Sequence, residues 1–351
     1  MESVCVDWRV LQKFTSEVFE KLGMAPEDAA LEAEVLVWAN LSGIDSHGVL
    51  RIPWYVELVE RALMNPKPNI RILRETPSVL MVEGDRAFGP VVTVFAMDKV
   101  ITKAKKTGIG WAVLRNITHQ GALGYYTLMA TRRNAVGIAI VCSPPNMAPF
   151  GARAPGVHNS PISIAAPAKQ HPPLVLDMAT SIAAGGKIRL ARDKGSPIPQ
   201  GWALDKNGEP TTDPNLASIL LPFGGPKGSG LAMMFECLTG IMAGNPLQEP
   251  ILSGKKKQRE HNQNGVVAAI DIGTFTDLEI YRQTVDGYIE GVKSLPRTEG
   301  FSEILVPGEL ERITYEKRLK NGIPLPRGTV ENLKETARKL NVALPEWLRD
   351  N

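Results

Sequence analysis

The feature that most constrains the fold is a change of pattern near residue 79. From there to residue 270, short runs rich in β-branched and apolar residues alternate with longer helical stretches, whereas both ends of the chain are helical in pattern. This alternation favours a layered α/β domain. We expect strands at 79–82, 111–114, 136–141, 162–166, 174–176 and 266–270. Helices are expected between them at about 90–106, 121–133 and 230–242.

The flanking parts of the chain predict further helices. Apolar residues recur at helical spacing from Val10 to Leu22, Pro26 opens a second helix that Gly43 closes, and Pro53 begins a third. After residue 276 we expect helices at 276–293, 308–320 and 329–340. We therefore divide the chain into an N-terminal helical segment (1–74), a central α/β domain (75–300) and a C-terminal helical segment (301–351) that packs with the N-terminal helices.

Composition excludes several classes of partner. Lys and Arg number 40 against 37 Asp and Glu, so the net charge of +3 favours neither nucleic acid nor an anionic membrane. No apolar run is long enough for a membrane span, and the acidic start differs from a signal peptide, so we expect a cytoplasmic protein. Cys5, Cys142 and Cys237 are too far apart for a zinc site, and we expect no metal and three buried thiols.

Five histidines occur, and His47 lies in the most suggestive setting. It sits in a loop between two helices, with Arg51 and Tyr55 at the start of the next helix, so the three side chains can converge. An arginine can hold a carboxylate by two hydrogen bonds while a nearby histidine exchanges a proton with the adjacent atom. On spacing alone, a helix-capping histidine and a surface arginine explain the pattern equally well.

Two other residues follow strands. His119 lies between the strand that ends near Leu114 and the following helix, a position where ligands bind in α/β sheets. Asp177 ends an apolar strand, where a carboxylate is usually a cap but can also hold an imidazole in its protonated form. The sequence does not decide between these roles.

A glycine-rich segment at 222–230 leads into an apolar helix and carries Lys227, which suits an anionic group such as phosphate. It does not fit the P-loop pattern, and no G-x-G-x-x-G motif follows a strand. Residue patterns alone therefore indicate a cytosolic α/β enzyme with an anionic ligand, without a standard dinucleotide fold.

Several ordered motifs together resemble one family. The chain is similar, from about residue 8 to 325, to the malate/L-lactate dehydrogenase type 2 family, which includes ureidoglycolate, sulfolactate and diketogulonate enzymes and cyclic-imine reductases. The motifs that carry the resemblance are SHGVLR (46–51), DMATS (177–181), IPQGWA (198–203), GEPTTDP (208–214) and LPFGGPKG (221–228). The resemblance implies a mixed-sheet NAD(P)-binding α/β domain of non-Rossmann, sulfolactate dehydrogenase-like type at 75–300, in a homodimer.

The resemblance also implies roles for individual residues. His47 is then the proton donor, Asp177 its partner and His119 an alternative acid or base that also contacts substrate, with Arg51 and Tyr55 as substrate contacts. The residues implied to border the NAD or NADP cofactor are Ser143, Asp177, Met178, Ala179, Lys227, Gly228, Pro307, Gly308 and Glu309. One departure stands out: many relatives have Gly-Thr-Asn-Pro where this chain has His158, Asn159, Ser160 and Pro161.

The expected reaction interconverts a small 2-oxo acid and its 2-hydroxy acid, with hydride from nicotinamide and a proton from His47. The alternatives are a ureidoglycolate dehydrogenase, an NADPH-dependent reductase of cyclic imino acids such as piperideine-2-carboxylate, and a non-catalytic nucleotide-binding member. NADP would need a basic side chain for its 2′-phosphate. The candidates for that contact are Lys187, Arg189, Arg192, Lys194, Arg312, Lys317 and Arg318.

Overall fold

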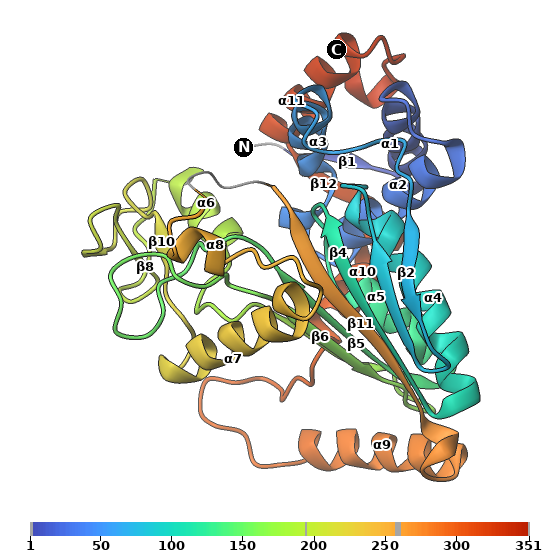
Figure 1. The fold of residues 1–351 in the computed structure, drawn as a ribbon. Coiled ribbons are helices and arrows are strands. Elements are labelled where there is room, and N and C mark those ends of the chain that lie inside the picture. Colours follow the sequence, from blue (N-terminus) through green and yellow to red (C-terminus); the bar gives the residue numbers. More distant parts are fainter. Residues whose placement is uncertain (1–2, 194, 257–260, 350–351) are drawn as a thin grey trace.

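A seven-stranded mixed sheet forms the centre of the molecule (Figure 1), with strand order β2-β3-β4-β11-β5-β6-β7. The structure is a computed structural model that describes residues 3–193, 195–256 and 261–349. The strands of the sheet are β2 (Arg71–Glu75), β3 (Val79–Glu83), β4 (Ile109–Ile117), β5 (Ala135–Cys142), β6 (Ile162–Ala166), β7 (Leu174–Met178) and β11 (Gln263–Asp271). The six expected strands are present. The additional strand β2 is exposed throughout, so it has no buried apolar face that a pattern could reveal.

The sheet combines one parallel pair with antiparallel pairs. Strands β3 and β4 run parallel and are connected by α4 (Gly89–Thr107), while the other neighbours are antiparallel. At the centre, Val267 of β11 lies opposite Ala112 of β4 and Ala139 of β5. The expected mixed-sheet α/β fold is confirmed.

Helices cover both faces of this sheet. Helices α4 and α5 (Gly124–Thr131) pack on one face around buried side chains such as Leu114 and Met97. The other face packs Val113 against Phe235 of α7 (Pro226–Glu236), which continues as a π-helix, η3 (Cys237–Ile241). Because successive strand residues point to opposite faces, Val113 and Leu114 belong to different cores.

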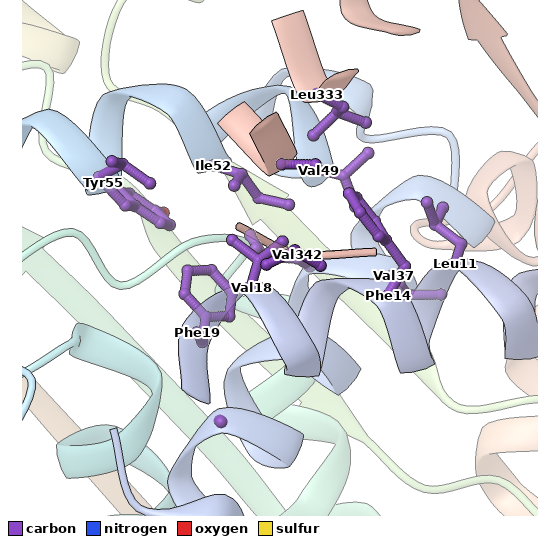
Figure 2. Close-up of a cluster of buried hydrophobic side chains, with 14 of the residues drawn as sticks. Leu11, Phe14, Val18, Phe19, Val37, Val49, Ile52, Tyr55, Leu333 and Val342 are labelled. Carbon is purple, nitrogen blue, oxygen red and sulfur yellow. The ribbon is translucent and has the colours of Figure 1, made fainter. Parts of the chain in front are cut away.

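The two ends of the chain share a separate helical layer. Strand β1 (Ser3–Val6) pairs antiparallel with β12 (Ile323–Pro326), a contact that the helical reading of both ends missed. Figure 2 shows how Phe14 and Val18 lie in one cluster with Leu333 and Val342, residues more than 300 positions away. The helical elements of this layer are α1 (Trp8–Lys21), α2 (Pro26–Leu41), η1 (Asp45–His47), η2 (Val49–Arg51), α3 (Ile52–Glu60), α11 (Arg327–Lys339) and η5 (Glu346–Leu348).

The glycine- and proline-rich region forms a smaller lobe beside the sheet (Figure 1). It holds a three-stranded antiparallel sheet of order β10-β8-β9 and a small core that includes Ile188 and Ile198. Its elements are α6 (Gly185–Asp193), β8 (Ala203–Leu204), β9 (Pro210–Thr211), β10 (Ile219–Leu220) and α8 (Glu249–Leu252). The remaining elements are η4 (Ile272–Thr274), α9 (Leu278–Lys293) and α10 (Glu309–Asn321).

The burial of the three cysteines differs in part from the expectation. Cys142 is buried as expected, but Cys5 and Cys237 are exposed, so that prediction was wrong for these two. Cys5 lies in β1, of whose four residues only the last is buried, and Cys237 begins the π-helix. The division at residues 74 and 300 stays a prediction. Within the described residues, no helix is long and apolar enough to cross a membrane, and no group of three or more acidic, cysteine or histidine side chains is placed to hold a metal ion.

Candidate active site

A cavity of about 980 Å³ lies where the helical layer, the edge of the large sheet and the small lobe meet. Its wall is built by the 42–51 loop, the β4–α5 connection, the end of β7, the start of α6 and the start of α10. This volume is at the upper end of the range of ligand pockets, about 300–1,000 Å³, so the cavity has room for more than one small acid.

His47 is fixed in this wall by the local structure of its loop. Asn40, near the end of α2, donates from Nδ2 to Asp45 Oδ1 (2.7 Å) and accepts from the backbone N–H of Val49 (2.8 Å). A Cβ at Gly48 would lie 2.2 Å from Asn40 Oδ1, so only glycine allows this close turn. The loop therefore presents the His47 ring to the cavity, with Nδ1 2.9 Å from Ser46 Oγ.

The environment of His47 disfavours its protonated form. Burial lowers its pKa from 6.5 to about 4, and the positive charges of Arg51 and Arg189 act in the same direction. The ring is therefore neutral at pH 7 when no ligand is bound. A neutral imidazole is ready to accept a proton, and an anionic ligand would oppose the two guanidinium charges.

His119 stacks against His47, with ring centroids 5.4 Å apart and planes 17° from parallel. The Tyr55 hydroxyl lies 2.6 Å from His119 Nδ1, within hydrogen-bond distance, and burial raises the pKa of Tyr55, so the phenol keeps its proton. Burial, together with Arg51 and the two neighbouring imidazoles, also lowers the pKa of His119 well below its usual value. Tyr55 is fully buried and is not part of the described cavity wall, which it contacts through His119, so its expected contact with substrate stays a prediction.

Two guanidinium groups face the same cavity. Arg51 donates from Nε to the Ser46 carbonyl (2.7 Å) and stacks over the Trp54 ring at 5.4 Å. Arg189, from α6, also lines the cavity and lies close enough to affect the pKa values of both His47 and Arg51. The sequence singled out Arg189 only as one of seven candidates for a 2′-phosphate. Arg189 reaches the cavity because α6 packs closely on the loop of His47: a Cβ at Gly186 would lie 2.8 Å from Ser46 Cβ. No local sequence pattern predicts this contact.

Asp177 lines the cavity, but its described contacts are those of a helix cap. Its Oδ2 accepts from the backbone N–H of Gly124 at the start of α5 (2.7 Å). Burial raises its pKa to about 6, while the bond from Gly124 acts in the opposite direction. Among the described residues, no hydrogen bond or ion pair joins Asp177 to His47. Their pairing stays a prediction for the enzyme with ligands bound.

The residues expected around the cofactor divide into two groups. Those on the cavity wall are Asp177, Met178, Ala179, Pro307 and Gly308. The other four, which the described wall does not include, are Ser143, Lys227, Gly228 and Glu309.

In this second group, Gly228 and Glu309 make structural contacts. Gly228 packs under the end of β7, because a Cβ there would lie 2.5 Å from the Thr180 carbonyl. Glu309 pairs with Lys293 and accepts from the Val306 N–H. Ser143 is buried just beyond the end of β5. Lys227 lies in the first turn of α7, beside Gly228.

The unusual His158–Asn159 pair also faces the cavity. The His158 ring is buried, with Nδ1 3.3 Å from Ser160 Oγ. Asn159 exchanges two hydrogen bonds with Asn146, at 2.9 and 2.8 Å. His158 and Asn159 thus both line the cavity; the sequence left open whether His158 fills the space of the usual glycine or touches the ligand, and whether the asparagine contact is shifted by one residue.

Comparison with known proteins places this cavity in a family context. A profile described as malate/L-lactate dehydrogenase matches residues 6–334. The chain belongs to the malate/L-lactate dehydrogenase family. The resemblance seen in the motifs is thereby confirmed, and the chain is an oxidoreductase of this family.

Individual relatives agree over almost the whole length. The L-sulfolactate dehydrogenase of Methanocaldococcus jannaschii is 37% identical over 96% of this chain and 97% of that protein. The ureidoglycolate dehydrogenase (NAD(+)) of Escherichia coli K12 is 33% identical over 86% of this chain and 87% of that protein. The solved structure of malate dehydrogenase from Pyrococcus horikoshii superposes with a TM-score of 0.88 and 36% identity, covering 97% of each chain.

Proposed function

We propose that this protein is an NAD- or NADP-dependent dehydrogenase that interconverts a small 2-oxo acid and its 2-hydroxy acid. One observation carries the proposal: two imidazoles, of His47 and His119, and two guanidinium groups, of Arg51 and Arg189, converge on one cavity wall. Such a site binds a carboxylate and moves a proton at the atom beside it.

The proposed roles follow from the chemistry of reduction. Bound nicotinamide would supply the hydride. Reduction leaves negative charge on the substrate oxygen, and we assign the proton delivered there to His47, whose neutral form is the base for the reverse reaction. Arg51 would hold the carboxylate, since its Nε bond to Ser46 fixes the direction of the guanidinium fork. His119, held by Tyr55, is the alternative donor.

We further propose that the acid carries a second anionic group. Arg51 alone is enough for one carboxylate, and Arg189 brings a second positive charge to the same wall. Relatives named as malate and sulfolactate dehydrogenases support this choice, because both of those substrates carry two anionic groups. A hydrogen bond to a charged group contributes about 1.5–3 kcal/mol, and Arg189 is exposed when no ligand is bound, so we expect a preference near the lower end of this range, about tenfold in kcat/KM.

The test is a substrate panel with both nucleotides. Oxaloacetate and sulfopyruvate should exceed pyruvate in kcat/KM, and Arg189→Met should remove most of that preference while Lys187→Met, an exposed charge on the same helix, should leave it. If kcat/KM is highest for a cyclic imino acid, the substrate is an imino acid and not an oxo acid. The Δ1-piperideine-2-carboxylate reductase of Pseudomonas syringae, 26% identical with a TM-score of 0.81, makes that arm worth including. Failure to bind either nucleotide would indicate a non-catalytic member.

The cavity is suited to the proposed cofactor. The starts of α6 and α10 lie on its wall, and helix starts of this kind bind phosphates through their backbone N–H groups. Of the seven basic candidates for a 2′-phosphate, Arg189 and Arg312 line the cavity, whereas Arg192 donates to the Pro214 carbonyl and Lys194 lies outside the described residues. Arg312→Ala should therefore raise KM for NADPH far more than KM for NADH if NADP is the cofactor.

We propose that the protein forms a homodimer through the outer face of α7 and η3. This face exposes large apolar side chains, with Met233 and Met234 each 56% exposed. Adjacent large apolar side chains that are exposed on a folded protein mark sites of association with another protein. Light scattering should give a dimer for the wild type and a monomer for Met234→Glu. The expected cytoplasmic location stays a proposal, which cell fractionation tests.

A further inference from the structure

Helix α10 connects the two halves of the proposed active site. Its start follows Pro307 and Gly308, which lie against β7: the Pro307 carbonyl accepts from the Val175 N–H (3.0 Å), two residues before Asp177. Its last turn carries Arg318, which lies against the loop that presents His47. The helix therefore spans from the strand of Asp177 to the loop of His47.

The contact at the second end is a defined cluster. Arg318 forms a two-pronged pair with the Asp45 carboxylate, with Nη1 to Oδ1 at 2.6 Å and Nη2 to Oδ2 at 3.0 Å, and also donates to the Asn40 carbonyl. Asn40 in turn holds Asp45 and Val49 on either side of His47. We call Arg318, Asp45 and Asn40 the loop clamp.

The clamp matters because α10 has few apolar contacts. None of its side chains is fully buried, and Tyr315 packs only at the edge of the hydrophobic core of the helical layer. Midway along it, Thr314 touches the turn at Gly43, where a Cβ would lie 3.0 Å from Thr314 Cγ2. The polar contacts of Arg318 are therefore the strongest described link between the last turn of the helix and the loop of His47.

We propose that Arg318 is a positioning residue that sets the geometry of His47 and Arg51 through Asp45. The inference rests on the proposed function, because it concerns the same proton transfer and carboxylate contact. Arg318 is not on the described cavity wall and acts through the clamp. A displacement of about 1 Å in an active site lowers turnover roughly a hundredfold, so small changes in this loop are measurable.

The test compares Arg318→Met with Lys320→Met, which removes the same charge from the same last turn at an exposed position. We expect Arg318→Met to lower kcat/KM for the oxo acid about ten- to a hundredfold, with the nucleotide Kd within about twofold of wild type, and Lys320→Met to change neither. Asp45→Asn should cause a similar loss, and the double variant should be no worse than either single one. Arg318→Lys keeps the positive charge but cannot form both hydrogen bonds to the Asp45 carboxylate, so its loss in kcat/KM should lie between those of the wild type and Arg318→Met.

The outcomes separate the two proposals. An active wild type with an unaffected Arg318→Met variant, or losses at Arg318 and Asp45 that multiply, overturns the inference alone. If Arg318→Met does not fold, Arg318→Lys decides: a loss of at least threefold in kcat/KM at unchanged melting temperature supports the clamp, and none overturns it. If the wild type turns over no substrate, the proposed function fails. The clamp is then tested by NMR titration of the His47 ring in the wild type and in Arg318→Lys. An identical His47 titration in the two proteins overturns the proposed role of Arg318.

Discussion

The low pKa of His47 predicts an unequal pH dependence for the two directions of the proposed reaction. Reduction of an oxo acid consumes one proton, so the ratio of kcat/KM for reduction to that for oxidation must fall tenfold per pH unit, whatever the mechanism. The pKa of the proton donor determines whether kcat/KM for reduction or kcat/KM for oxidation changes with pH. A group with a pKa near 4 is already deprotonated above pH 5, so the whole change should fall on reduction.

The size of the effect follows from burial and charge. Lowering the pKa of His47 from 6.5 to about 4 corresponds to roughly 3 kcal/mol against the protonated ring. At pH 7 about one ring in a thousand is then protonated, compared with about one in four for an ordinary histidine. Between pH 5 and pH 8, kcat/KM for reduction should fall tenfold per unit, while kcat/KM for oxidation stays level.

The assay measures initial rates in both directions at saturating nucleotide across this range. A level region for reduction below pH 6, with a break near 6.5, would refute the argument, because it would mean that the pKa of the donor is not depressed. Arg189→Met removes one of the positive charges that lower the pKa of His47, and should make the fall in kcat/KM for reduction shallower at the acid end of this range. Lys187→Met is the matched control and should leave the profile unchanged. His47→Ala and His119→Ala then show which ring is the donor, by a loss of about a hundredfold or more for that ring.

Three further predictions concern packing around the site. Tyr55→Phe removes the hydroxyl that hydrogen-bonds to a buried imidazole nitrogen, and should lower the free energy of unfolding by about 1–3 kcal/mol in urea titrations; an unchanged midpoint would contradict the bond. Gly48→Ala places a Cβ 2.2 Å from Asn40 Oδ1 and should lower kcat/KM by about tenfold or more, whereas Gly287→Ala, an open site in α9, should be neutral. Phe14→Ala should cost about 3–5 kcal/mol of stability, and a loss below 1 kcal/mol would mean that the helical layer is not closely packed.

The sequence predicted the elements with buried apolar patterns and missed those without them. The run Val136 to Val141 alternates and packs on both sides, so its strand was visible. Strands β1 and β12 pair ends of the chain more than 300 residues apart, and no local pattern carries that information. The exposed strand β2 was missed because propensity alone is weak without burial.

The site was predictable where neighbours in space are also neighbours in sequence. His47 and Arg51 share one loop, and their spacing predicted that the two side chains can converge. Both side chains line the cavity. The stacking of His119 on His47 joins two distant loops, and only a resemblance to known proteins placed both rings in one site. The role of Arg189 was out of reach for the same reason, because it depends on how the small lobe packs against Ser46.

The charge balance of the cavity links substrate binding to protonation. Burial first, and then the charges of Arg51 and Arg189, lower the pKa of His47 and keep its ring neutral when the cavity holds no anion, which suits the base of the oxidation direction. An oxo acid with two negative charges would offset both guanidinium groups, so its binding should raise the pKa of His47 and take up a proton. Calorimetric titration in buffers of different ionisation enthalpy should therefore show proton uptake on binding of a dianionic oxo acid at pH 6, and clearly less uptake for pyruvate. Equal uptake for both acids would mean that Arg189 does not act on the His47 ring, and the second anionic group would then have to bind elsewhere.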